Sequence, residues 1–530
     1  MDKLVIIGLD GGTFSIIDEM SEEELPFLKG LIKNGARANL KSTYPPLTGP
    51  AWASLYTGVN PGKHGIYDWQ RINQEGDREF INASNNSYPF FWNLVGEKAV
   101  LVNLPITYPP RPLEGVLVCG FPTHPESEYT YPATIRREIE SMGYVGGAVK
   151  AKSQGQSVDL YKLAAKTVEV FSHLIKKHDW TMAFLVVKET DSINHMTGSK
   201  LEAKKLYRYV DEQLRNVLPK GCTYVIVSDH GSTWCNYAFF LNDWLKAAGF
   251  LDYNLAIAPS YDLTQDWMEK VYAPRSMLTS ILEKLSISRH LTLKILRKAR
   301  LEGLKQFVPN WLKASVPPSN VVPNWKMTKA YPFSISSSAI NVNLEGREKF
   351  GSVKKEEYEL VKEDLVHKLS AVINPFDKKR CFREVLRREE IFKGDNLHHA
   401  SDIIYIEEEG LLVLVNRVSP NGAVVTEHKA SRHTMEGIFI ASGPGIKKGV
   451  AVSDLSIVDV SPIILHMRAK KVPDYMDGEV RKDIFEEGSE FFQREICYEK
   501  SSGSLVLDTF KYSDEEKGAI EESLRSLGYL

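Results

Sequence analysis

The sequence predicts an α/β protein with a mainly parallel central sheet flanked by helices, because two patterns alternate along its 530 residues. Short apolar runs resemble buried strands, and the stretches between them repeat apolar residues at helical spacing. This alternation is typical of strands joined by helices. We expect strands at Leu4–Leu9, Val100–Leu104, Met182–Val187, Tyr224–Val227, Asp402–Ile406 and Ile438–Ala441. We expect helices at Leu25–Asn34, Ala51–Tyr56, Val158–Lys177, Lys200–Asn216, Glu356–Val372 and Ile457–Met467, with a C-terminal helix that begins after Ser513.

Composition narrows the class of protein. The net charge is −2 with a hydrophobic content of 43%, so we expect a large core and no nucleic-acid partner. The five cysteines are scattered and lack CxxC spacing, which argues against a disulfide framework or a structural zinc site. The sequence has no apolar run long enough to span a membrane. We therefore expect a cytoplasmic protein without a transmembrane segment, whose oligomeric state the sequence leaves open.

Two stretches interrupt the alternation. Residues 121–157 are rich in Pro, Gly, Ser and Tyr and predict a long loop. Residues 253–328 lack strand signals and predict a helical insertion, or cap, between a first core part (1–252) and a second core part with the C-terminal helix (329–530). Within the insertion, residues 289–305 carry six Lys or Arg residues and one Glu. This basic segment could be a solvated helix face, a lid that recruits an anionic substrate, or a membrane-surface helix.

Side chains that bind metals cluster at the predicted strand ends. Asp10 and the Asp229–His230 pair directly follow strands, and Asp191 and His195 share one helical face at i, i+4 spacing. His433 lies just before the last strand. In open α/β sheets, sites form at the carboxyl ends of strands. Mixed Asp and His ligands suit zinc, manganese or iron, and six candidates suit two ions about 4 Å apart, as in phosphoryl-transfer enzymes.

Each feature alone also has a simpler explanation. An Asp after a strand often caps a helix, an i, i+4 Asp–His pair is often a surface pair, and "SDHG" is compatible with a turn. Thr48, at a predicted helix N-terminus in "PPLTGPAW", could be an N-cap or a nucleophile. The simpler explanations weaken jointly, because parallel strands would bring all these residues to one edge.

The ordered motifs resemble the alkaline phosphatase superfamily, in particular its type I phosphodiesterase/nucleotide pyrophosphatase branch and the prokaryotic predicted phosphohydrolase/phosphomutase group within it. The matching pieces include "GLDGGTF", "PPLTGPAWASLYTGVNPGKHGIYD", "TDSINHMTG", "VSDHG" and "HTMEGIFIASGPGIKKG". The resemblance implies an alkaline-phosphatase-like core and two divalent metal ions, with zinc favoured and manganese possible. It implies that one ion is held by Asp191, His195 and His433, and the other by Asp10, Thr48, Asp229 and His230. It also implies that Thr48 is the nucleophile and forms a phosphothreonyl intermediate.

The resemblance implies a phosphodiesterase or nucleotide pyrophosphatase that acts on a small phosphorylated substrate. The branch usually has an Asn shortly after its "HGI" motif, whereas this chain has Tyr67, Asp68 and Trp69. Tyr67 and Trp69 could offer aromatic surface to an ester group or pack in the core, and Arg432 could support a monoester instead. The alternatives are therefore a phosphomonoesterase or phosphomutase of the same superfamily, or a non-catalytic anion-binding protein.

Overall fold

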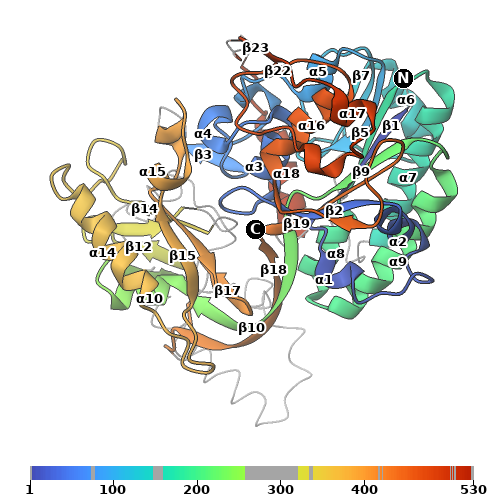
Figure 1. Ribbon diagram of the computed structural model, residues 1–530. Helices are drawn as coiled ribbons and strands as arrows, with labels where there is room; N and C mark the ends of the chain where they lie inside the picture. Colours follow the sequence, from blue (N-terminus) through green and yellow to red (C-terminus); the bar gives the residue numbers. More distant parts are fainter. Residues whose placement is uncertain are drawn as a thin grey trace, which may run out of the picture.

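The main body of the molecule is one large sheet, seen in a computed structural model that describes residues 3–72, 78–146, 159–256, 320–333, 338–415, 418–419, 422–501, 503, 505 and 509–526 (Figure 1). The strand order is β20-β2-β19-β9-β1-β8-β5-β6-β7, and β21 also pairs with β2. The strands are β1 (Leu4–Leu9), β2 (Gly35–Lys41), β5 (Ala99–Leu104), β6 (Gly115–Cys119), β7 (Thr130–Tyr131), β8 (Met182–Val187), β9 (Thr223–Val227), β19 (Glu436–Ser442), β20 (Val450–Ala451) and β21 (Leu455–Ser456).

The centre of the sheet is parallel and its strands end level with one another. Strands β9, β1, β8 and β5 run in the same direction, and Leu4 at the start of β1 pairs with both Met182 and Thr223. The carboxyl ends of β1, β8 and β9 therefore meet at one edge. Strand β19 runs antiparallel to β9 and β2. The expected mainly parallel sheet is thus confirmed, and it is mixed because the strand at 438–441 runs opposite to the centre.

Helices cover both faces of this sheet (Figure 1). One face carries α2 (Pro26–Lys33), α7 (Leu160–Lys177) and α9 (Lys200–Val217), and the other carries α3 (Thr48–Thr57), α5 (Phe91–Val95) and α16 (Val460–Met467). Sequence signals set their ends. Asp159 accepts a hydrogen bond from the backbone of Lys162 at the start of α7, and α3 ends at Gly58, whose φ of 70° suits glycine. The C-terminal helix α18 (Asp514–Ser526) follows Ser513, whose hydroxyl accepts from Glu516 N.

A smaller lobe has its own core. Strands β10 (Gly231–Phe240) and β18 (Val425–Thr434) pair and run out of the main body into this lobe (Figure 1). There β17 (Leu411–Leu414) joins β10, and α10 (Leu241–Ala247) and α14 (Tyr358–Ser370) pack with a second sheet. That sheet has the order β13 (Ala330–Pro332), β14 (Ala339–Val342), β16 (Ile403–Glu407) and β15 (Phe382–Arg387). The predicted strand at 402–406 is confirmed as β16, and it lies in this second sheet rather than in the central one.

Both predicted interruptions contain regular structure. The described part of 121–157 holds β7 and α6 (Thr134–Ser141), so a single long loop is wrong for it. The two ends of the predicted helical insertion are strands, β11 (Tyr253–Ala256) and β12 (Asn320–Pro323), which pair antiparallel. This pairing brings the ends of the insertion side by side. The basic segment at 289–305 lies outside the described residues, and the three-part division of the chain stays a prediction.

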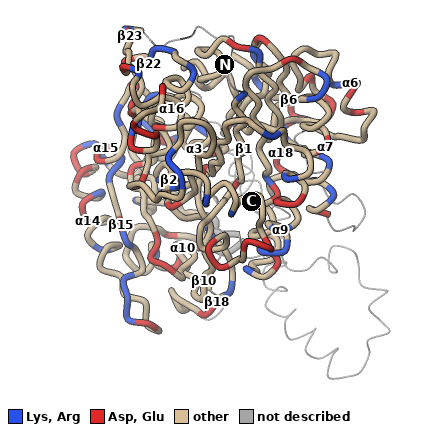
Figure 2. Tube along the Cα trace, turned by 45° about the vertical axis from the view of Figure 1, so that its right-hand side comes forward, with Lys and Arg blue, Asp and Glu red and all other residues tan. Residues whose placement is uncertain are grey.

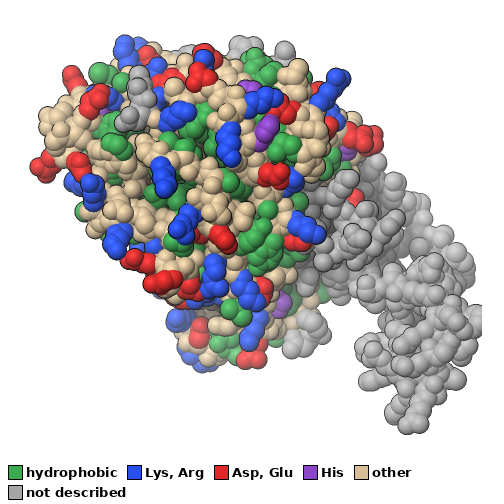
Figure 3. Space-filling view, turned by 90° about the vertical axis from the view of Figure 1, so that its right-hand side faces the viewer, with side chains coloured by type: hydrophobic (Ala, Val, Ile, Leu, Met, Phe, Trp, Pro, Cys, Tyr) green, Lys and Arg blue, Asp and Glu red, His purple; other side chains and the backbone are tan. Residues whose placement is uncertain are grey.

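Charges of both signs are interspersed along the described chain (Figure 2), and the face seen from the right of Figure 1 also mixes basic and acidic side chains (Figure 3). This distribution agrees with the small net charge and offers no support for a nucleic-acid surface on those parts. Among the described helices, none combines the length and hydropathy that a membrane crossing requires.

Candidate metal centre

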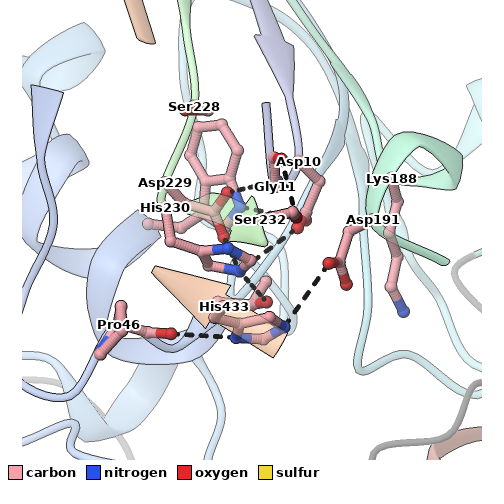
Figure 4. A network of polar contacts seen from close by, with 12 residues as sticks. Asp10, Gly11, Pro46, Lys188, Asp191, Ser228, Asp229, His230, Ser232 and His433 are labelled. Atoms are coloured by element: carbon pink, nitrogen blue, oxygen red, sulfur yellow. Dashed lines mark hydrogen bonds and ion pairs between the residues drawn. The ribbon is translucent and has the colours of Figure 1, made fainter. Parts of the chain in front are cut away.

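The level strand ends deliver the predicted ligands to one place. Asp10 directly follows β1, and Asp229 and His230 follow β9 after one intervening residue, Ser228. A single residue, Lys188, separates β8 from helix α8 (Glu189–Thr197), which carries Asp191 in its first turn. Because β1 lies between β8 and β9 in register, these residues converge on the same edge of the sheet (Figure 4).

Four of the predicted residues form a sealed set, which we call the inner group: Asp10, Thr48, Asp229 and His230. Their exposed fractions are 0% or 1%. His230 Nε2 lies 3.3 Å from Thr48 Oγ1, 3.2 Å from Asp229 Oδ2 and 3.8 Å from Asp10 Oδ1. Thr48 is the first residue of α3, so its hydroxyl also lies at a helix N-terminus, where negative charge is favoured.

Each inner carboxylate has one oxygen held by the protein and one without a hydrogen bond. Asp10 Oδ2 accepts from Trp52 Nε1 at 3.3 Å, and Asp229 Oδ1 accepts from Gly11 N at 3.1 Å. Asp10 Oδ1 and Asp229 Oδ2 are buried without a hydrogen-bond partner. Since buried carboxylate oxygens are normally hydrogen-bonded, two such atoms beside His230 Nε2 fit a site for a cation.

The other three predicted residues, Asp191, His195 and His433, form the outer group. His433 lies on β18, the strand that continues from the site into the smaller lobe. The Nε2 atoms of His195 and His433 are 2.7 Å apart. Asp191 reaches both rings, at 3.2 Å from His195 Nε2 and 3.5 Å from His433 Nε2. Two ring nitrogens and a carboxylate that converge in this way are a ligand set for a divalent metal.

The backbone fixes which nitrogen of two rings can act as a ligand. His433 Nδ1 lies 2.9 Å from Pro46 O, and His230 Nδ1 lies 3.0 Å from Gly231 O. A carbonyl oxygen only accepts, so Nδ1 carries the proton in each ring and Nε2 keeps its lone pair for a metal. The two rings stack with centroids 3.7 Å apart. His230 therefore belongs geometrically to both groups.

Two overlapping sets of ligand atoms meet the spacing of a metal site. The atoms of Asp10, Asp229 and His230 lie within 4.8 Å of one another, as do those of Asp191, His230 and His433. His195 joins the second set through its contacts with Asp191 and His433. The structure thus brings all seven predicted residues together. It also shows that His230 is shared between the sets, whereas the resemblance implies that it serves only the inner ion.

The electrostatics of the inner group favour a positive ion. Burial, followed by repulsion from Asp229 and Asp191, raises the pKa of Asp10 well above its usual value. Burial, together with the charge of Asp191, raises the pKa of Asp229 to about 7. For His230, burial and the neighbouring His433 lower the pKa well below its usual value. Buried carboxylates that cannot both ionise, next to a neutral imidazole, form a site that a divalent cation would stabilise.

Two further residues belong to the surroundings of the site and are not among the predicted site residues: Trp52 contacts Asp10, and Lys188 lies beside Asp191. Lys188 directly follows β8, is buried, and its charge is attracted to Asp10 and Asp191. Figure 4 shows its side chain beside Asp191. Trp52 follows Thr48 by four residues, so helical spacing could have placed it on the face of α3 that carries Thr48. The position of Lys188 at a strand end could have been noticed by the same rule that identified Asp10 and Asp229.

Two residues considered for substrate binding have other roles. Arg432 donates to the backbone oxygens of His433, Glu407 and Glu408, and it lines a cavity of about 390 Å³. Adjacent residues of a strand face opposite sides, so Arg432 points away from the site that His433 faces. Trp69 is 3% exposed and packs edge-on against Phe121, which is core packing rather than an open aromatic surface.

Comparison with known proteins agrees with these observations. Residues 4–435 match the family described as type I phosphodiesterase / nucleotide pyrophosphatase. A search of curated protein sequences gave no match. Solved structures with some similarity include murine ectonucleotide pyrophosphatase / phosphodiesterase 5, at 13% identity and a TM-score of 0.49 over 91% of this chain and 100% of that chain. The human protein has 14% identity and a TM-score of 0.48 over 91% and 99%.

A third structure is an inactive form of the murine protein in complex with AMP, at 13% identity and a TM-score of 0.49 over 92% of this chain and 100% of that chain. The family match does not distinguish the prokaryotic group, so membership of that group stays a prediction. The match does span most of the sequence and includes all seven residues of the inner and outer groups. The chain belongs to the type I phosphodiesterase/nucleotide pyrophosphatase family.

Proposed function

We propose that the protein is a dinuclear metal-dependent phosphohydrolase of the phosphodiesterase type, in which Thr48 is the nucleophile. The observation that carries this proposal is the position of Thr48 Oγ1, 3.3 Å from His230 Nε2 and beside two carboxylate oxygens that lack hydrogen bonds. Asp10, Asp229 and His230, together with Thr48, would hold one ion. Asp191, His195 and His433 would hold the other, with His230 at the boundary between them.

The ligand types restrict the metal. Imidazole and carboxylate together favour zinc or manganese over calcium, which prefers oxygen ligands alone. Zinc is the first choice, because the two Nε2 lone pairs fixed by backbone carbonyls are typical zinc ligands. The ions would supply positive charge that lowers the pKa of the Thr48 hydroxyl and neutralises the phosphate oxygens.

The chain itself would carry the covalent step. Thr48 Oγ1 would attack phosphorus as the bond from phosphorus to the leaving oxygen breaks, and the proton lost from Oγ1 would pass to the leaving oxygen, which gives a phosphothreonyl intermediate. Water would then attack the same phosphorus as the bond to Oγ1 breaks, and a proton lost by the water would return to Thr48. The backbone N–H groups at the start of α3 would favour the negative charge that develops on both occasions.

The proposal includes a small phosphorylated substrate, either a diester or a nucleotide-like pyrophosphate, and a cytoplasmic location. The five free cysteines support a reducing compartment. The smaller lobe adjoins the site, since β18 carries His433 near its end in the site and extends from there into that lobe. We further propose that the stretch 253–328 is a cap that sets specificity, since superfamily members tend to do so with insertions; its residues 257–319 lie outside the described part of the chain.

Thr48→Ala tests the proposal. We expect turnover of an aryl phosphodiester to fall by several powers of ten while both ions still bind, because the variant removes the attacking atom and leaves the other ligands. Thr57→Ala is the matched control: Thr57 is a buried residue at the other end of α3, with its hydroxyl bonded to Ala53 O. Mass spectrometry of acid-quenched wild type should detect a phosphate on Thr48. Activity of Thr48→Ala within about tenfold of wild type would contradict the assignment.

A further inference from the structure

Helix α3 contributes a second group to the site, one turn after the nucleophile. Trp52 is fully buried, and its indole N–H donates to Asp10 Oδ2 at 3.3 Å. The other oxygen of the same carboxylate, Oδ1, has no hydrogen bond and lies 3.8 Å from His230 Nε2. One short helix therefore contacts both Asp10, through Trp52, and His230, through Thr48.

The indole is held in a site shaped for it. Gly8, two residues before Asp10 on β1, lies under the ring, and a Cβ at Gly8 would come within 2.5 Å of Trp52 Cη2. Phe184 of β8 meets the ring edge-on, with centroids 6.2 Å apart, and Tyr56 stacks on it at 5.7 Å. A bulky ring fixed on several sides cannot easily rotate, so the direction of its N–H is set by packing.

Core packing alone does not require this partner. A buried Trp usually finds a backbone or side-chain acceptor for its N–H. Trp180 shows the ordinary solution in the same core, because its N–H donates to Ile175 O at 2.8 Å. Trp52 instead uses a carboxylate that faces His230. By occupying Oδ2, it fixes the rotation of the carboxylate and leaves Oδ1 directed into the inner group.

We propose that Trp52 is a positioning residue that orients Asp10 as a ligand of the inner metal ion and ties that ligand to the helix that carries Thr48. The inference rests on the proposed function, since it takes Asp10 to be a metal ligand. Outer hydrogen bonds of this kind usually change metal affinity about 10- to 100-fold. The effect should be confined to one of the two ions.

Trp52→Phe tests this role, because it keeps an aromatic ring and removes the N–H. Trp180→Phe is the matched control, a buried Trp in the same core whose N–H bonds to backbone. Metal-free protein is titrated with zinc against a chromophoric chelator, and the melting temperature is measured in parallel. We expect one ion to bind about tenfold more weakly in Trp52→Phe, the other to change less than about twofold, and Trp180→Phe to match wild type in both. Activity of Trp52→Phe should recover when zinc is raised.

Equal zinc affinities in Trp52→Phe and Trp180→Phe would overturn the inference while leaving the proposed function intact. A wild-type protein that binds no zinc would instead overturn the proposed function. If Trp52→Phe fails to fold, NMR of wild type and Asp10→Asn with 15N-labelled indoles replaces it. In metal-free protein, Asp10→Asn should shift one buried indole N–H signal, and zinc should shift the same signal in wild type. The absence of an indole N–H signal that shifts in both comparisons would overturn the inference.

Discussion

The inner and outer groups face each other across His230 but are built differently. The inner group is sealed, with exposed fractions of 0% or 1%, and its carboxylates are held by Trp52 and by the backbone of Gly11. The outer group is partly open: the side chains of His195 and His433 are 16% and 10% exposed. Its two histidines contact each other directly, at 2.7 Å between Nε2 atoms. In the inner group each carboxylate is thus held through one oxygen by a hydrogen bond, whereas the outer histidines contact one another and Asp191.

The difference follows from where the ligands come from in the chain. Asp10 and Asp229 are set by two neighbouring parallel strands, so their spacing is that of the sheet. Asp191 and His195 lie on α8, while His433 lies on β18, which also belongs to the smaller lobe. The outer group therefore depends on how that lobe is held against the main body. We expect the inner ion to bind more tightly and the outer ion to exchange more readily.

The largest expected effect is the loss of one metal ion when a residue of either group is replaced, which would distinguish the inner group from the outer group. Asp229→Ala should remove the inner ion and reduce turnover by several powers of ten, because it deletes a ligand from the sealed group. His433→Ala should remove the outer ion and leave the inner one. Elemental analysis of dialysed proteins would show about one ion per chain in each variant and two in wild type.

The control is His173→Ala, which changes a partly exposed His on α7 that pairs with Glu138. Metal-specific spectra after cobalt substitution would show whether the remaining ion differs between Asp229→Ala and His433→Ala. Unchanged metal content in both variants would rule out the proposed centre. Loss of both ions in each would mean that the groups cannot be occupied independently.

A smaller effect is the pH dependence of stability in the metal-free protein. The folded-state pKa of Asp229 is raised to about 7 from a usual value near 3.8, mainly by burial. The folded state then binds more protons than the unfolded state, so the free energy of unfolding should fall as pH rises from about 4 to about 7. The fall from pH 5 to pH 8 should be at most on the order of 3 kcal/mol.

Asp191 should contribute a pH dependence of the free energy of unfolding with the opposite sign. Burial alone would raise its pKa, but the charges of His195 and His433 lower it well below the usual value. The stabilisation that Asp191 contributes is fully present above its pKa in the unfolded chain and is lost as the pH falls towards its lower pKa in the folded state. Urea unfolding of metal-free wild type and Asp229→Asn between pH 5 and pH 8 would show a slope in wild type that the variant lacks. Equal slopes in wild type and Asp229→Asn would mean that the pKa of Asp229 is not raised in the folded state. The inner and outer groups would then not differ in their effect on the pH dependence of stability.

Most of the site was predictable because it follows local rules. Asp10, Asp229 and His230 follow buried strands, and a parallel sheet brings such residues together whatever the loops do. Asp191 and His195 need only one helical turn. The placement of Thr48 at a helix start depends on nearby prolines. Each candidate residue therefore stands out among its own few neighbours, and only the shared edge of the sheet turns these ambiguous signals into a candidate metal site.

The errors concern features that local sequence does not encode. A buried strand pattern does not say which sheet the strand joins: residues 402–406 have the same pattern as the central strands but form β16 of the smaller lobe. Arg432 is a candidate for substrate binding from its place beside His433, but both lie on β18, in which neighbours face opposite sides. The hydrogen bond from Trp52 to Asp10 depends on the empty space at Gly8, which appears only when α3 packs on the sheet.

The smallest expected effect concerns Lys188, which lies beside the outer group. Burial lowers its pKa to about 8 against the opposing attraction of Asp10 and Asp191, so it is mostly protonated at neutral pH. A phosphomonoester carries nearly one more negative charge than a diester there, so this ammonium should help the monoester more. We expect wild type to favour an aryl diester over the matching monoester by at least about tenfold, about 1.4 kcal/mol. Lys188→Met should widen that ratio by about threefold to tenfold, because it keeps the length of the side chain and removes the charge.

Steady-state kinetics on both substrates, with zinc and with manganese, measure this ratio. Lys200→Met is the control, since Lys200 pairs with Glu19 on the surface at the start of α9. Equal losses on both substrates in Lys188→Met would mean that the ammonium supports Asp191 and the fold of the outer group rather than substrate choice. A clear monoester preference of wild type with either metal would instead move the proposed function to a phosphatase or phosphomutase. In that case Lys188, and not Arg432, would be the group that accommodates the extra charge, because it lies beside Asp191 whereas Arg432 faces away from the site.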